Sequence, residues 1–333
     1  MTIKRMIRRR QNYMKKSRAL LMTFIAVMIM GIFSLANVNE VKAASTSITV
    51  KKKTVTFNDT TKTLNKKLGK YKASYTEPTG IRGYVYNSTK GRFIIAYTKG
   101  NKVIGYFVLS KEYRTPNAKS GYSYKQLKKK KFTDNAWYNV KSESGYINNG
   151  YFAVEKNGSK ISETEYLDYW GNKKTFAAKV YLSKYSIYFS DYGVKKYSSS
   201  AISKGIEKET LYVTNAFREY IGTSSLASSG KVAKVARAHS KDMATNGYFS
   251  HYSLDGRSPF DRMLNAGINY SWAGENIAAG QNCGVNFVLA WISSQGHRDN
   301  ITNSYFKYLG VGYAYNASST YGTYLTQNFC SFR

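Results

Sequence analysis

The pattern of hydrophobic and polar positions along the chain changes its period near residue 200. Before that point, short runs of alternating apolar and polar residues are separated by Gly and Asn turns. This pattern predicts β-strands, for example at 83–86, 92–97 and 103–109. Beyond it, apolar residues recur at helical spacing. The chain is therefore predicted to be an α+β protein in which a β-rich meander precedes a mixed region.

The mixed region is expected to contain four helices and two closing strands. The helices are predicted at 210–221, 231–246, 258–266 and 284–294, and the strands at 307–315 and 321–329. The second helix carries one apolar stripe, whose members are Val232, Val235, Ala236, His239 and Met243. The fourth helix is apolar on two sides, so we expect it to be buried on both.

Residues 1–43 have the pattern of an export signal. Eight Lys and Arg residues fall within the first 18 positions, an apolar stretch follows at 19–36, and cleavage is expected near Ala43. The alternative is an uncleaved anchor, because an apolar stretch of this length is at the lower limit for crossing a bilayer. In both cases the basic segment stays inside and the remainder is exported to the cell surface or beyond.

Charge is distributed unevenly along the chain. Of the net charge of +32, residues 44–208 contribute +21, whereas residues 209–333 contribute +3. This change indicates two domains with a boundary near 200–208. The predicted organisation is then a signal peptide at 1–43, a linker or first edge strand at 44–61, a basic β-rich domain at 62–200 and a mixed domain at 209–333.

The charge of the β-rich domain bears on the partners of an exported protein. Nucleic acid is rarely met outside the cell, so a domain this basic is expected to bind anionic wall polymers, such as teichoic acids, or anionic lipid head groups. The alternative is a well-solvated lysine surface that serves solubility. No protein partner can be named from the sequence.

The two cysteines, Cys283 and Cys330, both lie in the mixed domain. Export makes a disulfide between them chemically possible, and it would stabilise the fold by about 3–4 kcal/mol in the chain-entropy model. Two buried free thiols are the alternative.

All three histidines also lie in the mixed domain. His239 belongs to an apolar helix stripe and is expected in the core. His251 and His297 each follow a predicted helix end in polar loop sequence, and Glu275 lies in a loop or at a strand edge. Two imidazoles and one carboxylate could form a metal site or an acid–base cluster. Their spacings of 24 and 22 residues leave both possibilities open.

A series of ordered motifs runs through the mixed domain. These are Asn215–Arg218, Ala236–Met243, Tyr248–His251, Gly256–Arg262, Gly274–Ala278, Trp291–Ile301, Leu309–Gly312 and Tyr324–Phe329. With these motifs, the segment from about 209 to the C-terminus resembles the CAP superfamily of cysteine-rich secretory, antigen 5 and pathogenesis-related proteins. It is most similar to the bacterial SCP-like branch.

The resemblance implies an α/β/α sandwich with a small antiparallel sheet. It also implies a cleft lined by two histidines and acidic residues, which His251, Glu275 and His297 match. His239, Ser294 and Asn276 are expected to support this cleft. Many relatives carry a second Glu at the position of Ser294, so the fourth cleft residue is missing here. The remaining three could hold a divalent cation such as zinc.

The middle segment has a weaker resemblance of its own. Its pieces Leu68–Lys70, Gly83–Asn87 and Asn101–Gly105 are similar to the CAP-associated N-terminal domain that precedes such modules in Gram-positive bacteria.

The sequence does not decide whether the protein is an enzyme. The first hypothesis is a wall-associated binding or interaction module. The second is a metal-dependent hydrolase of wall or peptide substrates, with His251 or His297 as base and Glu275 orienting the base or binding metal. The third is a lipid-binding protein. No serine or cysteine lies in a setting typical of a nucleophile.

Overall fold

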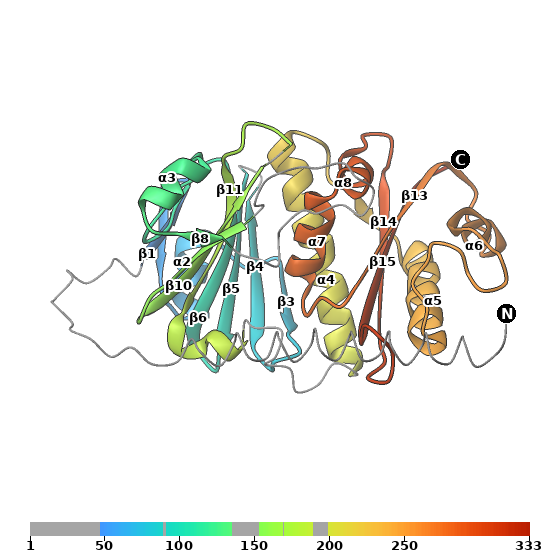
Figure 1. Cartoon of the computed structure of the whole chain (residues 1–333), viewed down its shortest axis with the longest axis horizontal. Coiled ribbons are helices and arrows are strands. Elements are labelled where there is room, and N and C mark those ends of the chain that lie inside the picture. Colours follow the sequence, from blue (N-terminus) through green and yellow to red (C-terminus); the bar gives the residue numbers. More distant parts are fainter. Residues whose placement is uncertain (1–46, 89–90, 135–152, 169, 189–198) are drawn as a thin grey trace, which may run out of the picture. The chain divides into compact units, whose positions relative to one another are not determined.

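The alternating pattern of the first domain folds into one antiparallel sheet of eight strands. In spatial order these are β3 (Ala73–Thr76), β4 (Arg82–Ser88), β5 (Arg92–Lys99), β6 (Lys102–Leu109), β11 (Thr175–Leu182), β10 (Ile161–Leu167), β9 (Ala153–Asn157) and β8 (Thr133–Asp134). Two meanders therefore meet where β6 pairs with β11 (Figure 1). The computed structural model describes residues 47–88, 91–134, 153–168, 170–188 and 199–333. Within them, the predicted α+β fold class is confirmed.

The segment that we interpreted as a linker or first edge strand contributes two strands. β1 (Ser47–Val50) pairs with β2 (Lys53–Thr56) and with β7 (Tyr113–Arg114) in a three-stranded sheet. The helix α2 (Thr61–Leu68) follows, and a capping box at Thr60 fixes its start. Apolar side chains of this layer, including Ile48 and Val55, cover one face of the eight-stranded sheet.

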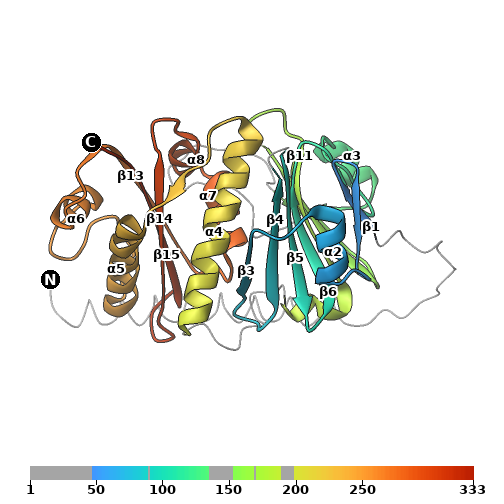
Figure 2. The same cartoon turned by 180° about the vertical axis from the view of Figure 1, so that it is seen from behind.

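The mixed domain folds into a four-stranded sheet between two helical layers, as predicted. Its strands, in order, are β12 (Ala227–Ser228), β14 (Tyr308–Tyr315), β15 (Thr323–Phe332) and β13 (Tyr270–Ala279). The helix α5 (Gly230–Asn246) packs on one face of this sheet, while α4 (Ser200–Ile221) and α7 (Gly284–Ser293) pack on the other (Figure 2). The edge strand β13 is the element that carries Glu275.

Two glycines set how closely α5 approaches the sheet. A Cβ atom at Gly310 would lie 2.2 Å from the backbone nitrogen of Ala233, and one at Gly312 would lie 2.0 Å from that of Arg237. Any side chain at either position would therefore force α5 away from β14. The close contact is extended by Ser240, whose hydroxyl donates to the carbonyl of Gly312 at 2.8 Å. These contacts hold the end of α5, and the loop that follows it, against the sheet.

The helix α4 joins the two domains. It begins at Ser200, not at the predicted residue 210, because the hydroxyl of Ser199 accepts a hydrogen bond from the backbone of Ile202 and caps it. Its outer side packs on β3, where a Cβ at Gly205 would lie 2.6 Å from the carbonyl oxygen of Thr76. Its inner side packs on α7 and β14. One apolar cluster consequently runs from the eight-stranded sheet, through α4, to the four-stranded sheet.

A buried polar cluster lies within this shared core. The carboxylate of Glu209, on α4, accepts hydrogen bonds from the hydroxyls of Tyr75 at 2.6 Å and Tyr97 at 3.0 Å, and from the backbone of Val285 at 3.2 Å. Burial, followed by the charge of Glu209, raises the pKa of Glu77 well above its usual range. Hydrogen bonds thus connect the eight-stranded sheet and the helix α7 to one carboxylate on α4.

The two cysteines are free thiols, so the disulfide alternative is not realised. Cys330 lies on β15 in a cluster with Val232 and Met263, on the side of α5 and α6 (Pro259–Asn265). Cys283 caps α7 and packs against the core on the side of α4. The sheet therefore separates the two sulfur atoms. The candidate signal segment lies outside the described residues, among which no helix is both long and apolar enough to cross a membrane.

Candidate functional site

The three cleft residues come from three different elements. Glu275 lies on β13, His251 lies in the loop between α5 and α6, and His297 lies on the short helix α8 (Gln295–Thr302). The expectation that His297 lies in a loop is thus wrong, because α8 follows α7 after a single residue, Ser294. Glu275 lies within a strand, and not in a loop.

The strand β13 could not be predicted from the sequence, because a glycine stands where a strand would usually have an apolar residue on its inner face. A Cβ at Gly274 would lie 2.8 Å from the ring of Phe306 and 3.0 Å from Oδ1 of Asn300. The strand therefore lacks a regular alternation of apolar residues. Because Gly274 has no side chain, α8 can lie close to β13. Asn300 of α8 donates to the carbonyl of Glu275 at 3.1 Å and to the side chain of Asn276 at 2.9 Å.

The carboxylate of Glu275 is buried, and each of its two oxygens has a hydrogen-bond partner. Its side chain is 2% exposed. Oε2 accepts a hydrogen bond from the guanidinium of Arg262 at 2.7 Å, and Oε1 lies 2.8 Å from Nδ1 of His251. The side chain of Arg262, on α6, is itself only 6% exposed. A buried carboxylate and a buried guanidinium thus form an ion pair next to the exposed imidazole of His251.

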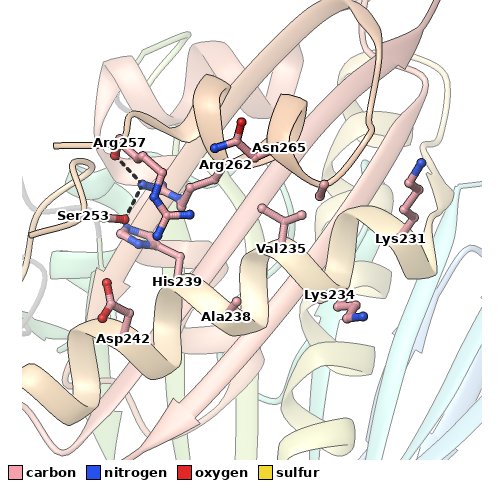
Figure 3. Close-up of a pocket in the computed structure, with 11 residues that line it drawn as sticks. Lys231, Lys234, Val235, Ala238, His239, Asp242, Ser253, Arg257, Arg262 and Asn265 are labelled. Carbon is pink, nitrogen blue, oxygen red and sulfur yellow. Dashed lines mark hydrogen bonds between the residues drawn. The ribbon is translucent and has the colours of Figure 1, made fainter. Parts of the chain in front are cut away.

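Arg262 also fixes the loop that carries His251. Its Nη1 donates to the backbone carbonyls of His251 at 2.8 Å and Arg257 at 3.1 Å, and to the hydroxyl of Ser253 at 3.2 Å (Figure 3). The loop is thereby closed around one guanidinium group. The capping box of Ser258 and Asp261, together with Pro259, starts α6 close to the predicted residue 258, in the position this arrangement needs.

His251 is the exposed member of the site. Its side chain is 45% exposed, in contrast with its carboxylate partner. Because a carboxylate only accepts hydrogen bonds, the contact with Glu275 requires a proton on Nδ1 of His251, and in the neutral ring Nε2 is then the nitrogen without a proton. Nε2 is then free to accept a proton. This is the arrangement of a general base held in one tautomer by a buried carboxylate.

His297 is held by contacts separate from the Glu275–Arg262 pair. Its Nδ1 is 2.9 Å from the hydroxyl of Ser294, and its carbonyl accepts a hydrogen bond from Asn276 at 3.1 Å. Burial, followed by the neighbouring charge of His251, lowers the pKa of His297. The side chains of Ser294 and Asn276 therefore contact His297. Neither of them contacts the side chain of Glu275.

His239 is a core residue, as its helix stripe predicts. It is 1% exposed, and its Nε2 lies 3.0 Å from the carbonyl of Ser250, immediately before His251. Burial lowers the pKa of its imidazole. The neutral ring therefore helps to position the loop.

The residues that could hold zinc do not fit a metal centre in this arrangement. Among the described parts of the chain, no group of three His, Cys, Asp or Glu side chains is arranged to hold a metal ion. Both oxygens of Glu275 are already engaged, and one of them faces the positive charge of Arg262 at 2.7 Å. A cation at this carboxylate would be repelled by the guanidinium. We therefore derive no step through a metal.

Arg262 is the functional residue for which the sequence alone suggested no role. It falls within the motif Gly256–Arg262, and a single arginine next to a capped helix start was the available signal. The sequence could not show that Arg262 lies next to Glu275, because Glu275 belongs to a separate element, the strand β13.

Comparisons with known proteins agree with this fold. Residues 211–329 match the family model described as the CAP, or cysteine-rich secretory protein, family. The C-terminal domain is a CAP domain of the bacterial SCP-like kind. The match does not extend to the β-rich domain, whose similarity to the CAP-associated domain remains a prediction.

Two curated relatives come from Bacillus subtilis strain 168. The uncharacterized protein YkwD is 46% identical over 112 residues, which cover 34% of this chain and 44% of that protein. The uncharacterized membrane protein YlbC is 39% identical over 123 residues, which cover 37% of this chain and 34% of that protein. The chain thus spans less than half the length of either relative.

Two solved structures share the fold. An extracellular protein containing an SCP domain from Bacillus anthracis str. Ames aligns with a TM-score of 0.68 and 23% identity, over 90% of this chain and 99% of that one. A cysteine-rich secretory protein from Staphylococcus aureus subsp. aureus Mu50 aligns with a TM-score of 0.60 and 16% identity, over 82% and 93% of the two chains. Both alignments extend beyond the CAP domain, so a similar fold occurs on both sides of α4.

The ion pair gives a direct stability prediction. Arg262→Met should lower the free energy of unfolding by about 3–5 kcal/mol, because it leaves the charge of Glu275 buried without its partner. The same substitution should cost much less in a Glu275→Gln background. Chemical denaturation of the four proteins in this cycle measures the coupling.

Arg257→Met is the matched control, since Arg257 is about half exposed and pairs with the exposed Asp255. We expect it to have no measurable cost. An equal cost of Arg262→Met in both backgrounds would contradict the pairing.

Proposed function

We propose that the protein is an exported bacterial surface protein whose β-rich domain binds anionic polymers of the cell wall and whose CAP domain presents the cleft. One observation carries this proposal. Five of the eight acids described between residues 47 and 188 are buried, whereas most of the lysines described there are exposed, so lysines dominate the charge on the described surface of this domain.

Five acidic residues of this domain are each at most 7% exposed. They are Asp59, Glu77, Glu163, Glu165 and Asp168. Burial raises the pKa of Glu77, Glu163, Glu165 and Asp168, which reduces their negative charge. The tyrosine hydroxyl of Tyr113 and the hydroxyl of Thr115 contact Glu165 inside the domain. Asp59 pairs with Lys67 at 2.7 Å, and the other four acids form no ion pair with a lysine among the described residues.

The lysines, in contrast, cluster on and after the helix α3 (Tyr124–Lys129). Lys125 and the run 128–131 are all exposed. Lys128 contacts Asp134 at 3.4 Å, which is the one ion pair of this cluster among the described residues. Closely spaced ammonium groups on a well-ordered helix attract a flexible polyanion over about 10 Å at 0.1 M salt.

The names of two similar proteins support export. One solved structure is titled an extracellular protein, and one curated relative is titled a membrane protein. The basic residues and apolar stretch of the first 43 positions point to the same destination.

The cleft supports hydrolysis as a second candidate function. The specific observation is His251, which is exposed to the solvent and held through Nδ1 by a buried carboxylate. Such a histidine can take a proton from a water molecule or from a substrate hydroxyl. The hydroxyl of Ser294 contacts His297 and not His251, so it is not part of the His251–Glu275 pair.

The wall-binding proposal predicts salt-sensitive binding to purified walls. The protein should sediment with walls that carry teichoic acid and not with walls stripped of it, and high salt should release it, because exposed charges are screened. Lys125→Gln/Lys129→Gln should weaken binding roughly tenfold. The charge-matched control Lys204→Gln/Lys241→Gln, on α4 and α5, should bind like wild type.

Equal binding to stripped walls, or indifference to salt, would contradict this function. Binding only to phosphatidylglycerol vesicles would assign the membrane surface as the partner in place of the wall.

The hydrolase candidate predicts a different result. If walls or wall peptides are cleaved, His251→Gln should reduce the rate by about 10²-fold or more, as expected for loss of a general base. The released fragments can be measured by chromatography. Cleavage that is unchanged in His251→Gln and in Glu275→Gln would exclude this mechanism.

A further inference from the structure

A buried lysine of the β-rich domain contacts a buried asparagine of the CAP domain. Nζ of Lys179, on β11, donates to Oδ1 of Asn286, on α7, at 3.0 Å. The two residues are 7% and 6% exposed, and they lie 107 positions apart in the sequence. Here a side chain of the eight-stranded sheet reaches across the shared core to a helix of the other domain.

The surroundings of Lys179 are largely apolar on its own sheet. Its cross-strand neighbour on β6 is Phe107, which belongs to the apolar cluster that the two domains share. Burial disfavours the charged form of an amine, and the neutral amine is the form that attacks a carbonyl carbon. This position therefore holds a potential nucleophile inside the core.

The side-chain amide of Asn286 is the group that this amine can attack. Its carbon Cγ lies one C=O bond, about 1.2 Å, beyond the oxygen that Lys179 contacts. Its Nδ2 donates to Oδ1 of Asn282 at 2.7 Å, which holds the amide in place. Because β11 and α7 fix the two reactants next to each other, the reaction has the advantage of an intramolecular step.

Two buried carboxyl groups lie near this pair and can carry the protons that the reaction moves. Oε2 of Glu209 accepts from the backbone of Val285, the residue before Asn286, at 3.2 Å. Glu77 is 5% exposed, and its Oε1 has no hydrogen-bond partner among the described residues. Burial, and then the charge of Glu209, raise the pKa of Glu77, whereas the positive charge of Lys179 opposes this rise. An acid with a raised pKa can take up and return a proton near neutral pH.

We propose that Lys179 and Asn286 form an intramolecular isopeptide bond. The ionised member of the pair Glu77 and Glu209 first takes one proton from the ammonium group of Lys179. The neutral Nζ then attacks Cγ of Asn286, and a new C–N bond forms while the bond from Cγ to Nδ2 breaks. A second proton passes from Nζ to the leaving nitrogen, which departs as ammonia. The products are one secondary amide and one ammonia molecule, with no change in oxidation state, so no further reactant is needed.

The bond joins the two domains covalently across their shared core. It closes a large loop of the chain, and a cross-link of this kind stabilises mainly by restricting the unfolded state. Unlike a disulfide, it is not broken by reduction. If the β-rich domain binds walls as proposed above, the bond also keeps the cleft attached to that domain under tension. The bond itself does not depend on wall binding.

The test is mass spectrometry of the purified full-length protein after denaturation. Its intact mass should be lower than the mass of its sequence by one ammonia molecule. Trypsin cleaves after Lys and Arg, so the bond should leave residues 175–184 uncut at Lys179 and linked to residues 263–298, which contain Asn286. The unreduced mass of the sequence, or cleavage after Lys179, would overturn the proposal. Loss of ammonia without a linked peptide would overturn it too, since this indicates a succinimide at an asparagine.

Substitutions of the two reactants provide a second test. Lys179→Arg keeps the positive charge but removes the primary amine, and Asn286→Ala removes the amide, so both variants should have the mass of their sequences. Asn286→Asp should give the same linked peptide as wild type, because the same amide forms with loss of water. A linked peptide in Lys179→Arg would contradict the assignment. If a variant does not fold, the peptide map of the wild-type protein still decides whether the bond exists.

The part of the buried acids is tested by the rate of linkage. In Glu77→Gln, the linked fraction after cell-free synthesis should grow about 10²-fold more slowly, as expected for loss of an acid–base group. The matched control is Glu163→Gln, at a buried acid whose cross-strand neighbour Val180 belongs to the apolar cluster on the other face of the sheet. This variant should link as fast as wild type. Equal rates in Glu77→Gln and wild type would contradict the role of Glu77.

Discussion

A buried carboxylate on an edge strand is the constraint on which the functional part of this protein depends. Glu275 is almost completely removed from water, so it must be paired within the fold. Arg262 supplies the charge, and the same guanidinium binds the backbone of the loop that carries His251. Satisfying one acid therefore fixes a strand, a helix and a loop relative to one another, and leaves one exposed imidazole in a defined orientation.

The rest of the C-terminal domain holds this arrangement in place through close backbone packing. Gly310 and Gly312 allow α5 to lie directly on β14, which sets the start of the loop before His251. Gly274 allows α8 to approach β13 from the other face, which brings His297 to the cleft. On the far side, α4 shares its core with the β-rich domain, so the basic surface and the cleft belong to one folded unit.

The sequence predicted the features that depend on local pattern. The meander, the stripe of α5 with His239, the capped start of α6 and the two-sided burial of α7 all follow from periodicity and capping residues. The features that it did not predict depend on distant contacts. The strand β13 has a glycine where an apolar residue would mark it, and α8 is short and polar. The role of Arg262 exists only because α6 and β13 meet, and no local pattern records that contact.

The orientation of His251 by Glu275 can be measured most directly by long-range ¹H–¹⁵N correlation of the imidazole nitrogens at neutral pH. The chain has only three histidines, so single substitutions assign every signal. The account predicts that His251 carries its proton on Nδ1, and that Glu275→Gln removes this preference while leaving His239 unchanged. A wild-type His251 with its proton on Nε2 would contradict it.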